Sequence, residues 1–470
     1  MVFPVVGGTQ DTGYEISNSL RFNDDDSPSM TIASLGSSSS NAKKWTVSFW
    51  AKLSSGLGGH RCVFSAGESS GGNYVQLNFT DGDELQLYSS NALGEANNTA
   101  TNIKTNAKYR DISAWYHVVW AIDTTQSTNT NRIKLYVNGA QVTSFATANN
   151  YPAQNTDNDR VGANNIDHFI GKFVDSSSQY FDGYLSDFYF IDGDAKSYTD
   201  FGETNDNGVW IPKKYTGTFG NNGFKMEFQQ TGTSANSSGI GADTSGNDHH
   251  FSVSNLAAIN VTEDTPTNNF ATLNSIGTIG VYNQQATAGV SNGNLEIPRS
   301  RNSGESDGAA TANIAFPTNG KWYYEFKWAS RDGGQAWAGL TTHIDASKNV
   351  IYYAANGNSY VDNSSASYGD TYTVGDIISV AVNKDDNQVT FYKNGTSQGT
   401  LTNNSLDDYD FFAYFSDGGG SDGPNYQVNF GNPIHSISSG NSDANGYGNF
   451  EYAVPSGYYA LCTKNLAEYG

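Results

Sequence analysis

Two short acidic turns carry residues of the type that binds a metal ion. Asp24, Asp25 and Asp26 are consecutive, and Asp81 and Asp83 lie in a second turn. Carboxylate oxygens on turns suit Ca²⁺, which accepts irregular coordination geometry. Neither turn matches the D-x-[DN]-x-[DN]-G calcium loop, so a solvated acidic turn is the alternative at both places. We therefore treat calcium as a candidate ion and expect that no cofactor is required.

Three histidines also need an interpretation. His249 and His250 follow Asp248 directly. Adjacent residues of an extended chain point to opposite faces, so these two would rarely share one ion. His117 lies within an apolar run of strand-forming residues. The sequence therefore predicts packing and hydrogen-bonding roles for all three.

Two aromatic segments have the chemistry of a glycan-binding surface. Sugar rings stack on exposed aromatic faces, while amides and carboxylates bind their hydroxyl groups. The candidate ligand-binding residues in these segments are Tyr352, Tyr353, Asn356, Tyr180 and Asp182. Aromatic residues of a β-sandwich are more often part of the core, which is the competing interpretation.

Motifs of hydrolytic enzymes do not occur in a suitable context. The chain lacks the glucanase pattern E-x-D-x-x-E, the zinc motif H-E-x-x-H and the P-loop. The letters G-x-S-x-G occur in three Gly- and Ser-rich loops, at residues 67–71, 304–308 and 419–423. A nucleophile elbow needs a strand before the serine and a helix after it, and we do not expect this strand–helix pair in any of the three loops. We expect a protein that is not an enzyme.

The composition favours strands and turns over helices. Aromatic residues make up 13% of the chain, charged residues only 15%, and there are 51 glycines. Apolar side chains alternate in residues 45–51 and 321–328, as in half-buried strands. Two further strands end on Asn-Gly, at 138–139 and 394–395, which suits the positive φ angles of a tight type I′ hairpin. The sequence predicts an all-β protein.

The charge balance excludes some partners. Lys and Arg number 25 against 47 Asp and Glu, a formal net charge of −22. Binding to a nucleic acid backbone needs a basic surface, so we expect no nucleic acid partner. The chain has no apolar run of membrane-spanning length, and residues 1–8 lack the basic region of a signal peptide. We expect no membrane insertion, and synthesis in a cytoplasm.

The chain is long enough for two domains. We predict an N-terminal arm at residues 1–13 and a first sandwich at 14–262, within which the assignment of 195–262 is uncertain. A polar, Pro-containing linker is expected at 263–280 and a second sandwich at 281–470, ending in a strand at 457–463. Cys62 and Cys462 are too few for a disulfide framework.

Motifs in each half resemble a known domain family. Residues 45–51, 115–119, 135–139 and 183–188 resemble the laminin G and pentraxin branch of the concanavalin A-like lectins. Residues 320–326, 375–380 and 389–395 resemble a SPRY domain. The resemblance implies two jelly-roll-type β-sandwich domains in tandem, concanavalin A-like and then SPRY-like, that bind partners through loops.

The combination is similar to virion proteins of tailed bacteriophages, with residues 264–270 between the halves and 458–462 near the end. This resemblance implies a location in the virion after assembly in the host cytoplasm, with other virion proteins as partners. We expect a tail-fibre or appendage adhesin that binds host surface glycan or protein. A homo-oligomer is expected, a trimer being usual for a fibre. The alternative is a decoration, collar or connector protein that binds only other virion proteins.

Overall fold

The computed structural model describes residues 13–54, 59–68, 72–95, 99–174, 178–275, 289–298, 309–330, 334–342, 350–362, 364–420 and 423–470. Within these residues, the chain divides into two compact units, and the boundary lies between Thr267 and Asn268. The predicted arm lies outside the described residues except for Gly13, and so do residues 276–280 of the predicted linker.

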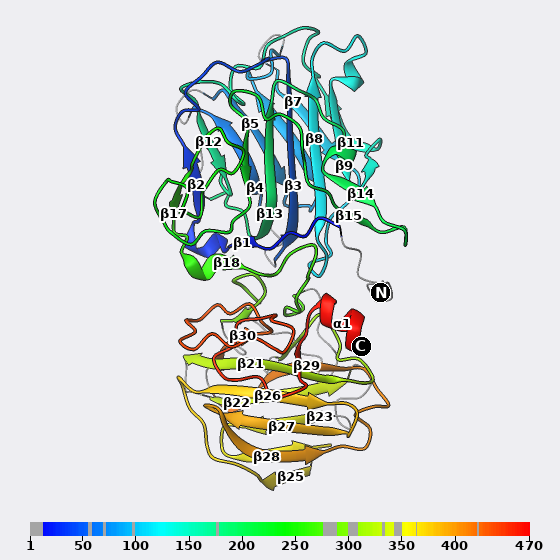
Figure 1. The fold of residues 1–470 in the computed structure, drawn as a ribbon, viewed down its shortest axis with the longest axis vertical. Coiled ribbons are helices and arrows are strands. Elements are labelled where there is room, and N and C mark those ends of the chain that lie inside the picture. Colours follow the sequence, from blue (N-terminus) through cyan, green and yellow to red (C-terminus); the bar gives the residue numbers. More distant parts are fainter. Residues whose placement is uncertain are drawn as a thin grey trace. The chain divides into compact units, whose positions relative to one another are not determined.

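The first unit, residues 13–267, is a sandwich of two antiparallel sheets (Figure 1), each of eight strands in the part of the chain described. One sheet contains, in spatial order, β10 (Ala140–Gln141), β9 (Ile133–Val137), β8 (Tyr116–Asp123), β3 (Lys44–Leu53), β13 (Gly183–Asp192), β1 (Ser19–Phe22) and β18 (Val261–Thr262), with β16 (Phe224–Met226) beside β13. The other contains β11 (Phe145–Asn149), β7 (Thr101–Thr105), β6 (Leu85–Ser90), β5 (Tyr74–Phe79), β4 (Arg61–Gly67), β12 (Asp167–Ile170), β2 (Ser29–Ile32) and β17 (Ser252–Ser254).

The alternation of apolar and polar residues in residues 45–51 identifies which side chains form the core of this sandwich. In β3, Trp45, Val47 and Phe49 point between the sheets and pack in one core cluster with residues of β4 and β5 such as Phe64 and Leu77. Successive side chains of a strand point to opposite faces, so Thr46 and Ser48 lie on the other side. The strand pairings therefore follow the apolar pattern.

Residues 195–262, whose assignment the sequence left uncertain, belong to the first unit. They include a separate hairpin of β14 (Gly202–Thr204) and β15 (Trp210–Pro212) and two short 3-10 helices, η4 (Tyr198–Asp200) and η5 (Ala258–Asn260). Phe201 and Tyr215 from this segment pack against Tyr189 on the side of β13 that faces away from the main core. The segment thus covers one outward face of the sandwich.

The second unit, residues 268–470, is another two-sheet sandwich (Figure 1). One sheet contains, in spatial order, β19 (Glu296–Ile297), β30 (Asn425–Asn429), β21 (Lys321–Ser330), β26 (Ile377–Asn383), β27 (Gln388–Lys393) and β28 (Thr396–Thr402), with β31 (Tyr459–Ala460) parallel to β21. The other contains β20 (Ala309–Thr311), β29 (Phe411–Gly420), β22 (Gly334–Thr342), β23 (Val350–Ala354), β24 (Asn358–Val361) and β25 (Ser364–Ser367). The predicted all-β fold of two tandem sandwiches is confirmed.

Both predicted Asn-Gly turns are present. Asn138 and Gly139 have φ angles of 47° and 78°, and Asn394 and Gly395 have 48° and 78°. The first turn joins β9 to β10 and the second joins β27 to β28. The remaining 3-10 helices described are η1 (Asp24–Asp26) and η3 (Asn129–Asn131).

The C-terminal prediction was partly wrong. The expected last strand is limited to β31, and α1 (Thr463–Tyr469) begins directly after Cys462. Leu466 of this helix packs into the core of the second unit, which the strand prediction did not anticipate. None of the helices in the described ranges is long and apolar enough to cross a membrane.

The stretch expected to be a linker is packed against both units in turn. Asp264 is buried in the first unit, where its carboxylate lies 2.8 Å from Lys52 Nζ. Phe270 is buried in the second unit and forms a β-bridge with Cys462, while the backbone N–H of Ala271 donates to the carbonyl of Leu461. The segments that begin and end the second sandwich therefore lie side by side.

Candidate functional site

Strand β23 separates two of the predicted ligand-binding residues. Ile351 and Tyr353 point into the core of the second unit, whereas Tyr352 points to the outward face of the sheet. Tyr353 is fully buried against Tyr372 and Phe391, and its hydroxyl donates to the carbonyl of Asp370. Tyr353, predicted as a ligand-binding residue, therefore lies in the core, because neighbouring residues of a strand point to opposite faces.

Tyr352 belongs to a stack of three aromatic rings. Its ring lies 5.0 Å from that of Trp337 on β22 and 4.6 Å from that of Tyr360 on β24, with interplanar angles of 19° and 16°. Tyr352 and Tyr360 are direct cross-strand partners, which holds the rings in register. Trp337 and Tyr360 are partly exposed, whereas Tyr352 between them is buried. We call these three residues the aromatic stack.

Amide groups lie at the edge of the aromatic stack. Asn356 is exposed in the turn between β23 and β24, where its side-chain oxygen accepts from the backbone N–H of Asn358 at 3.0 Å. Its side-chain nitrogen lies 3.4 Å from Oε1 of Gln335, the exposed residue two positions before Trp337. Flat rings beside amide donors and acceptors are the groups that bind the faces and hydroxyls of a sugar. The predicted Asn356 is therefore next to Gln335, which shares one face of β22 with Trp337.

Tyr180 and Asp182 lie in the other unit and do not join the aromatic stack. Tyr180 is partly exposed, and its ring lies 5.9 Å from Lys172 Nζ. Asp182 is only 1% exposed, and burial raises the pKa of its carboxyl to about 8, with Asp24 adding to the shift. Asp182, predicted as a ligand-binding residue, therefore lies inside the domain and not at its surface.

One of the predicted calcium ligands is already paired. Asp83 is buried, and its two carboxylate oxygens accept from Arg61 and Arg110, each at 2.8 Å. Two guanidinium groups thus neutralise this carboxylate, and each of its oxygens already accepts a charge-assisted hydrogen bond. The arginines are 22 residues before and 27 residues after it in sequence, so the acidic turn alone did not reveal them.

The other acidic candidates remain at the surface. Asp24, Asp25 and Asp26 form the exposed helix η1, and Asp81 is exposed in its turn. Although Asp24 is exposed, partial desolvation of its carboxyl group and the neighbouring Asp25 raise its pKa. Among the described residues, no three His, Cys, Asp or Glu side chains are grouped so that they could hold a metal ion. These turns therefore show no assembled calcium site.

The histidines have the structural surroundings that the sequence predicted. His117 Nε2 lies 2.9 Å from Ser48 Oγ, and its Nδ1 accepts from Trp210 Nε1 at 3.1 Å. His250 Nδ1 accepts from the backbone N–H of Asp243, and His249 Nε2 lies 3.1 Å from the carbonyl of Asn221. All three hold local structure together.

Sequence reasoning missed Trp337 and Tyr360. The signal was present in β22, where Ala336, Ala338 and Leu340 occupy the core and Trp337 must therefore face outward. A large aromatic residue at an outward position between small inward ones marks a surface feature. Tyr360 needed the β23–β24 register, which the sequence did not give.

Two family models match parts of this chain. One, described as the concanavalin A-like lectin/glucanases superfamily, matches residues 24–197, and the other, the SPRY domain, matches residues 321–433. None of the curated proteins matches.

Solved structures give weak likenesses, two of them to parts of the chain and one to nearly its whole length. The SPRY domain of human HERC1 is 18% identical, with 26% of this chain and 82% of that chain covered and a TM-score of 0.24. The native heptameric SAP-like pentraxin from Limulus polyphemus is 15% identical, with 39% and 80% covered and a TM-score of 0.27. Domains LG4-5 of the mouse laminin alpha1 chain are 9% identical, with 97% and 89% covered and a TM-score of 0.26. No conclusion rests on these low scores.

Proposed function

From the premise that a concanavalin A-like domain is followed here by a SPRY domain, we propose that this chain is an adhesin of a tailed-bacteriophage particle, in a tail fibre or appendage. Its ligand is a glycan or protein on the host surface. Domains of both kinds often mediate binding. The observation that carries the proposal is the aromatic stack of Trp337, Tyr352 and Tyr360, with two partly exposed rings on one outward face of the SPRY domain.

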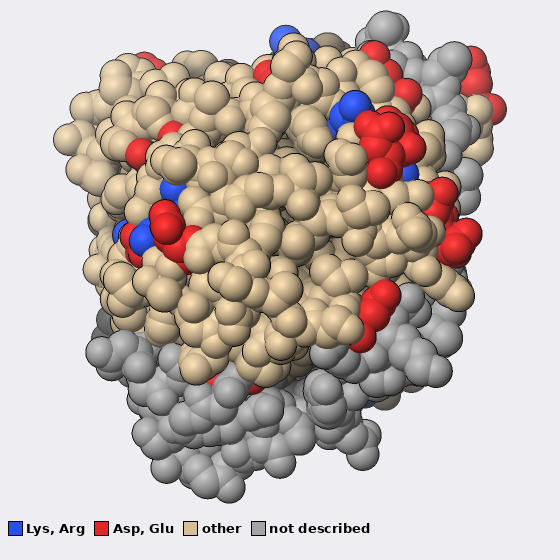
Figure 2. Space-filling model, turned by 90° about the horizontal axis from the view of Figure 1, so that it is seen from below, with Lys and Arg blue, Asp and Glu red and all other residues tan. Residues whose placement is uncertain are grey.

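The chemistry of this face favours an uncharged glycan over an anionic one. The side-chain amides of Gln335 and Asn356 contact each other and carry no charge, and Gln335 stands two residues before Trp337. The chain as a whole has a net charge of −22, which repels anionic polymers at long range. Figure 2 shows one end of the SPRY domain, where charged side chains are few among uncharged residues.

The phage assignment has its support in the two segments that resemble virion proteins. Residues 264–270 and 458–462 are far apart in sequence, yet Phe270 and Cys462 are bridged in the structure. Thr463 continues this joint, since its backbone N–H donates to the carbonyl of Asn269 and its hydroxyl accepts from the N–H of Asn269. The end of the first segment and the end of the second therefore pair with each other within the SPRY domain.

A second candidate function is a decoration, collar or connector protein that binds only other virion proteins. The exposed strands β25 and β28 favour it, because each ends its sheet and neither contains a charged residue or a proline. Such an edge offers backbone N–H and C=O groups to a strand of another protein. A homo-oligomer, including a trimer, would also use such edges.

The test is a glycan array together with host-cell binding by the full chain. Saturable binding that Tyr360→Ala abolishes supports the adhesin. The matched control is Tyr409→Ala, because Tyr409 is a tyrosine of the same domain that is 37% exposed and lies outside the stack. Absence of binding to every glycan and host surface, with the protein folded, would refute the adhesin and leave the connector. An EDTA arm tests the calcium prediction, since only calcium-dependent binding is lost with the chelator.

A further inference from the structure

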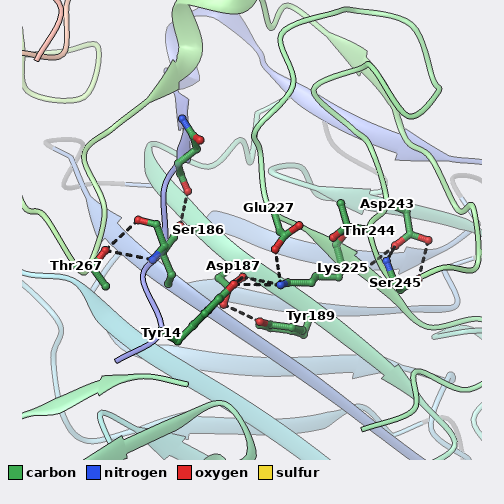
Figure 3. Close-up of polar contacts among 12 residues, drawn as sticks. Tyr14, Ser186, Asp187, Tyr189, Lys225, Glu227, Asp243, Thr244, Ser245 and Thr267 are labelled. Carbon is green, nitrogen blue, oxygen red and sulfur yellow. Dashed lines mark hydrogen bonds and ion pairs between the residues drawn. The ribbon is translucent and has the colours of Figure 1, made fainter. Parts of the chain in front are cut away.

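A cluster of titratable side chains lies apart from the aromatic stack, in the concanavalin A-like domain (Figure 3). It consists of Tyr14, Asp187, Tyr189, Lys225 and Glu227. Asp187 and Tyr189 come from β13, and Lys225 comes from the neighbouring strand β16, where it is the cross-strand partner of Tyr189. None of these contacts takes part in the proposed adhesion.

The backbone of Asp187 is unusual for a central strand. Its φ angle is 46°, and the register between β13 and β3 shifts between Ser186 and Tyr189. A left-handed conformation is unfavourable for a residue with a side chain. A bulge of this kind changes the direction of the side chain that it carries. Here it accompanies the placement of a carboxyl group, 2% exposed, beside a lysine.

Three side-chain groups with different chemical roles lie close together: the amine of Lys225 and the carboxyl groups of Asp187 and Glu227. Lys225 Nζ lies 3.5 Å from Asp187 Oδ1 and 2.6 Å from Glu227 Oε1. The hydroxyls of Tyr14 and Tyr189 donate to the two oxygens of Asp187, at 3.1 Å and 2.7 Å. The Tyr14 and Tyr189 rings lie 5.4 Å and 5.1 Å from Lys225 Nζ. A nucleophile, a polarised carboxyl group and a base therefore share one poorly solvated space.

The electrostatic environment prepares the two carboxyl groups for different roles. Burial raises the pKa of Asp187, which favours the carboxylic acid, the form that an amine can attack. Although burial acts in the opposite direction, the hydrogen bond from Lys225 lowers the pKa of Glu227 and keeps it a carboxylate base. Burial lowers the pKa of Lys225, but Asp187, Tyr14 and Glu227 raise it more, so the resting group is an ammonium ion. A proton of Lys225 must first move to Glu227, an unfavourable step by these pKa directions, over a direct contact of 2.6 Å.

We propose that Lys225 and Asp187 condense to form an intramolecular amide, an isopeptide bond between β13 and β16. Glu227 accepts one proton from the Lys225 ammonium. The neutral amine attacks Cγ of the protonated Asp187, and the new N–C bond forms. The C–OH bond then breaks, and the hydroxyl leaves as water with a second proton from the nitrogen, which keeps one hydrogen. The proton on Glu227 passes to solvent, and no oxidant or other co-reactant is consumed.

The first measurement is the intact mass of the full chain, unfolded in denaturant. The expected mass is lower than the mass calculated from the sequence by that of one water molecule. Lys225→Arg and Glu227→Gln are expected to restore the full mass, because one lacks the amine and the other lacks the base. The matched control is Lys196→Arg, since Lys196 Nζ lies 2.6 Å from Asp194 Oδ2 at a more exposed site. This control should keep the deficit.

The position of the bond is tested by protease digestion and tandem mass spectrometry. A linked peptide pair containing Asp187 and Lys225 is expected in the wild type and absent in Lys225→Arg. This separates the isopeptide from a succinimide at Asp192-Gly193, which also loses water but links no peptides. The full calculated mass in the folded wild-type protein would overturn the proposal. A deficit that persists in Lys225→Arg, or the absence of the linked pair, would overturn it too. The wild-type measurements decide the matter even if a variant fails to fold.

Discussion

Both domains place aromatic side chains on an outward face of a sheet, but with opposite consequences. In the concanavalin A-like domain, Tyr189, Phe201 and Tyr215 are buried because residues 195–219 lie over the sheet. In the SPRY domain, Trp337 and Tyr360 stay partly exposed while their rings are already stacked on Tyr352. The difference shows that an outward aromatic residue is core or binding surface according to whether the chain itself covers it.

The two faces also differ in how polar groups hold them. The cover of the first domain is anchored by Trp210, whose indole N–H donates to His117, itself stacked between Trp50 and Trp210. The aromatic stack of the SPRY domain is held by ring contacts and strand register. Rigid stacked rings lose little conformational freedom on binding, so this face is preorganised for a ligand.

The largest expected effect tests the covered face. Phe201→Ala removes a ring that is 1% exposed and lies 5.1 Å from Tyr215 and 5.3 Å from Tyr189. We expect the free energy of unfolding of this domain to fall by about 4 kcal/mol, measured by urea denaturation. Val209→Ala is the matched control, because Val209 lies in the same segment and is 51% exposed. Equal losses for the two variants would show that the segment is not a core element.

Acid should weaken the same cover through His117. Burial lowers the pKa of His117 to about 3, below its usual value near 6.5. The folded state then binds fewer protons than the unfolded state between these values, so stability is lost as the pH falls from 6.5 towards 3. The loss is about 1.4 kcal/mol per pH unit and about 3 kcal/mol at pH 4.

The pH effect is measured by thermal denaturation between pH 7 and pH 4. The loss arises because the charged imidazolium is buried, and protonated Nδ1 can also no longer accept the Trp210 N–H. His117→Gln should show a shallower pH dependence than the wild type. His168 is also buried, with its pKa lowered to about 4, so the variant keeps part of the dependence. Identical slopes would mean that His117 is not the group that titrates.

A smaller effect is expected where Trp210 packs on glycine. A Cβ atom at Gly202 would lie 2.3 Å from Cζ2 of the Trp210 ring, so Gly202→Ala must displace the ring. We expect a loss of about 2 kcal/mol in the free energy of unfolding, with a change in tryptophan fluorescence. Gly59→Ala is the control, because a Cβ atom there would meet nothing within 4 Å. An unchanged fluorescence spectrum would show that the ring is not fixed at this position.

The smallest effect on stability is expected in the aromatic stack. Trp337→Ala removes a partly exposed ring, and we expect a stability loss of about 1 kcal/mol in the SPRY domain. Binding to the host cells or glycan that the wild type recognises should fall by about tenfold or more, measured by titration. A variant that unfolds as readily as a core mutant would make the stack a structural element and remove the contrast between the two faces.

The sequence alone was sufficient to predict the structural elements that depend on a local pattern of residues. The alternation in residues 45–51 and 321–328 predicted β3 and β21, and the Asn-Gly pairs predicted two hairpin turns. The motifs also indicated a concanavalin A-like domain and a SPRY domain, in that order. These succeed because strand period, turn conformation and motif order are properties of neighbouring residues.

The tertiary structure decided which of the selected residues reach the surface. Tyr352 and Tyr353 are the same residue type at neighbouring positions, but strand β23 directs Tyr352 to the aromatic stack and Tyr353 to the core. The sequence predicted Asp83 as a cation ligand, but in the structure it pairs with Arg61 and Arg110, which come from other segments.

The contact of Asp187 with Lys225 is likewise absent from any local pattern. Such outcomes depend on which distant segment folds against a side chain. Burial and pairing are properties of that contact and not of the residue type, so the sequence determined the strands and the tertiary structure determined their surroundings.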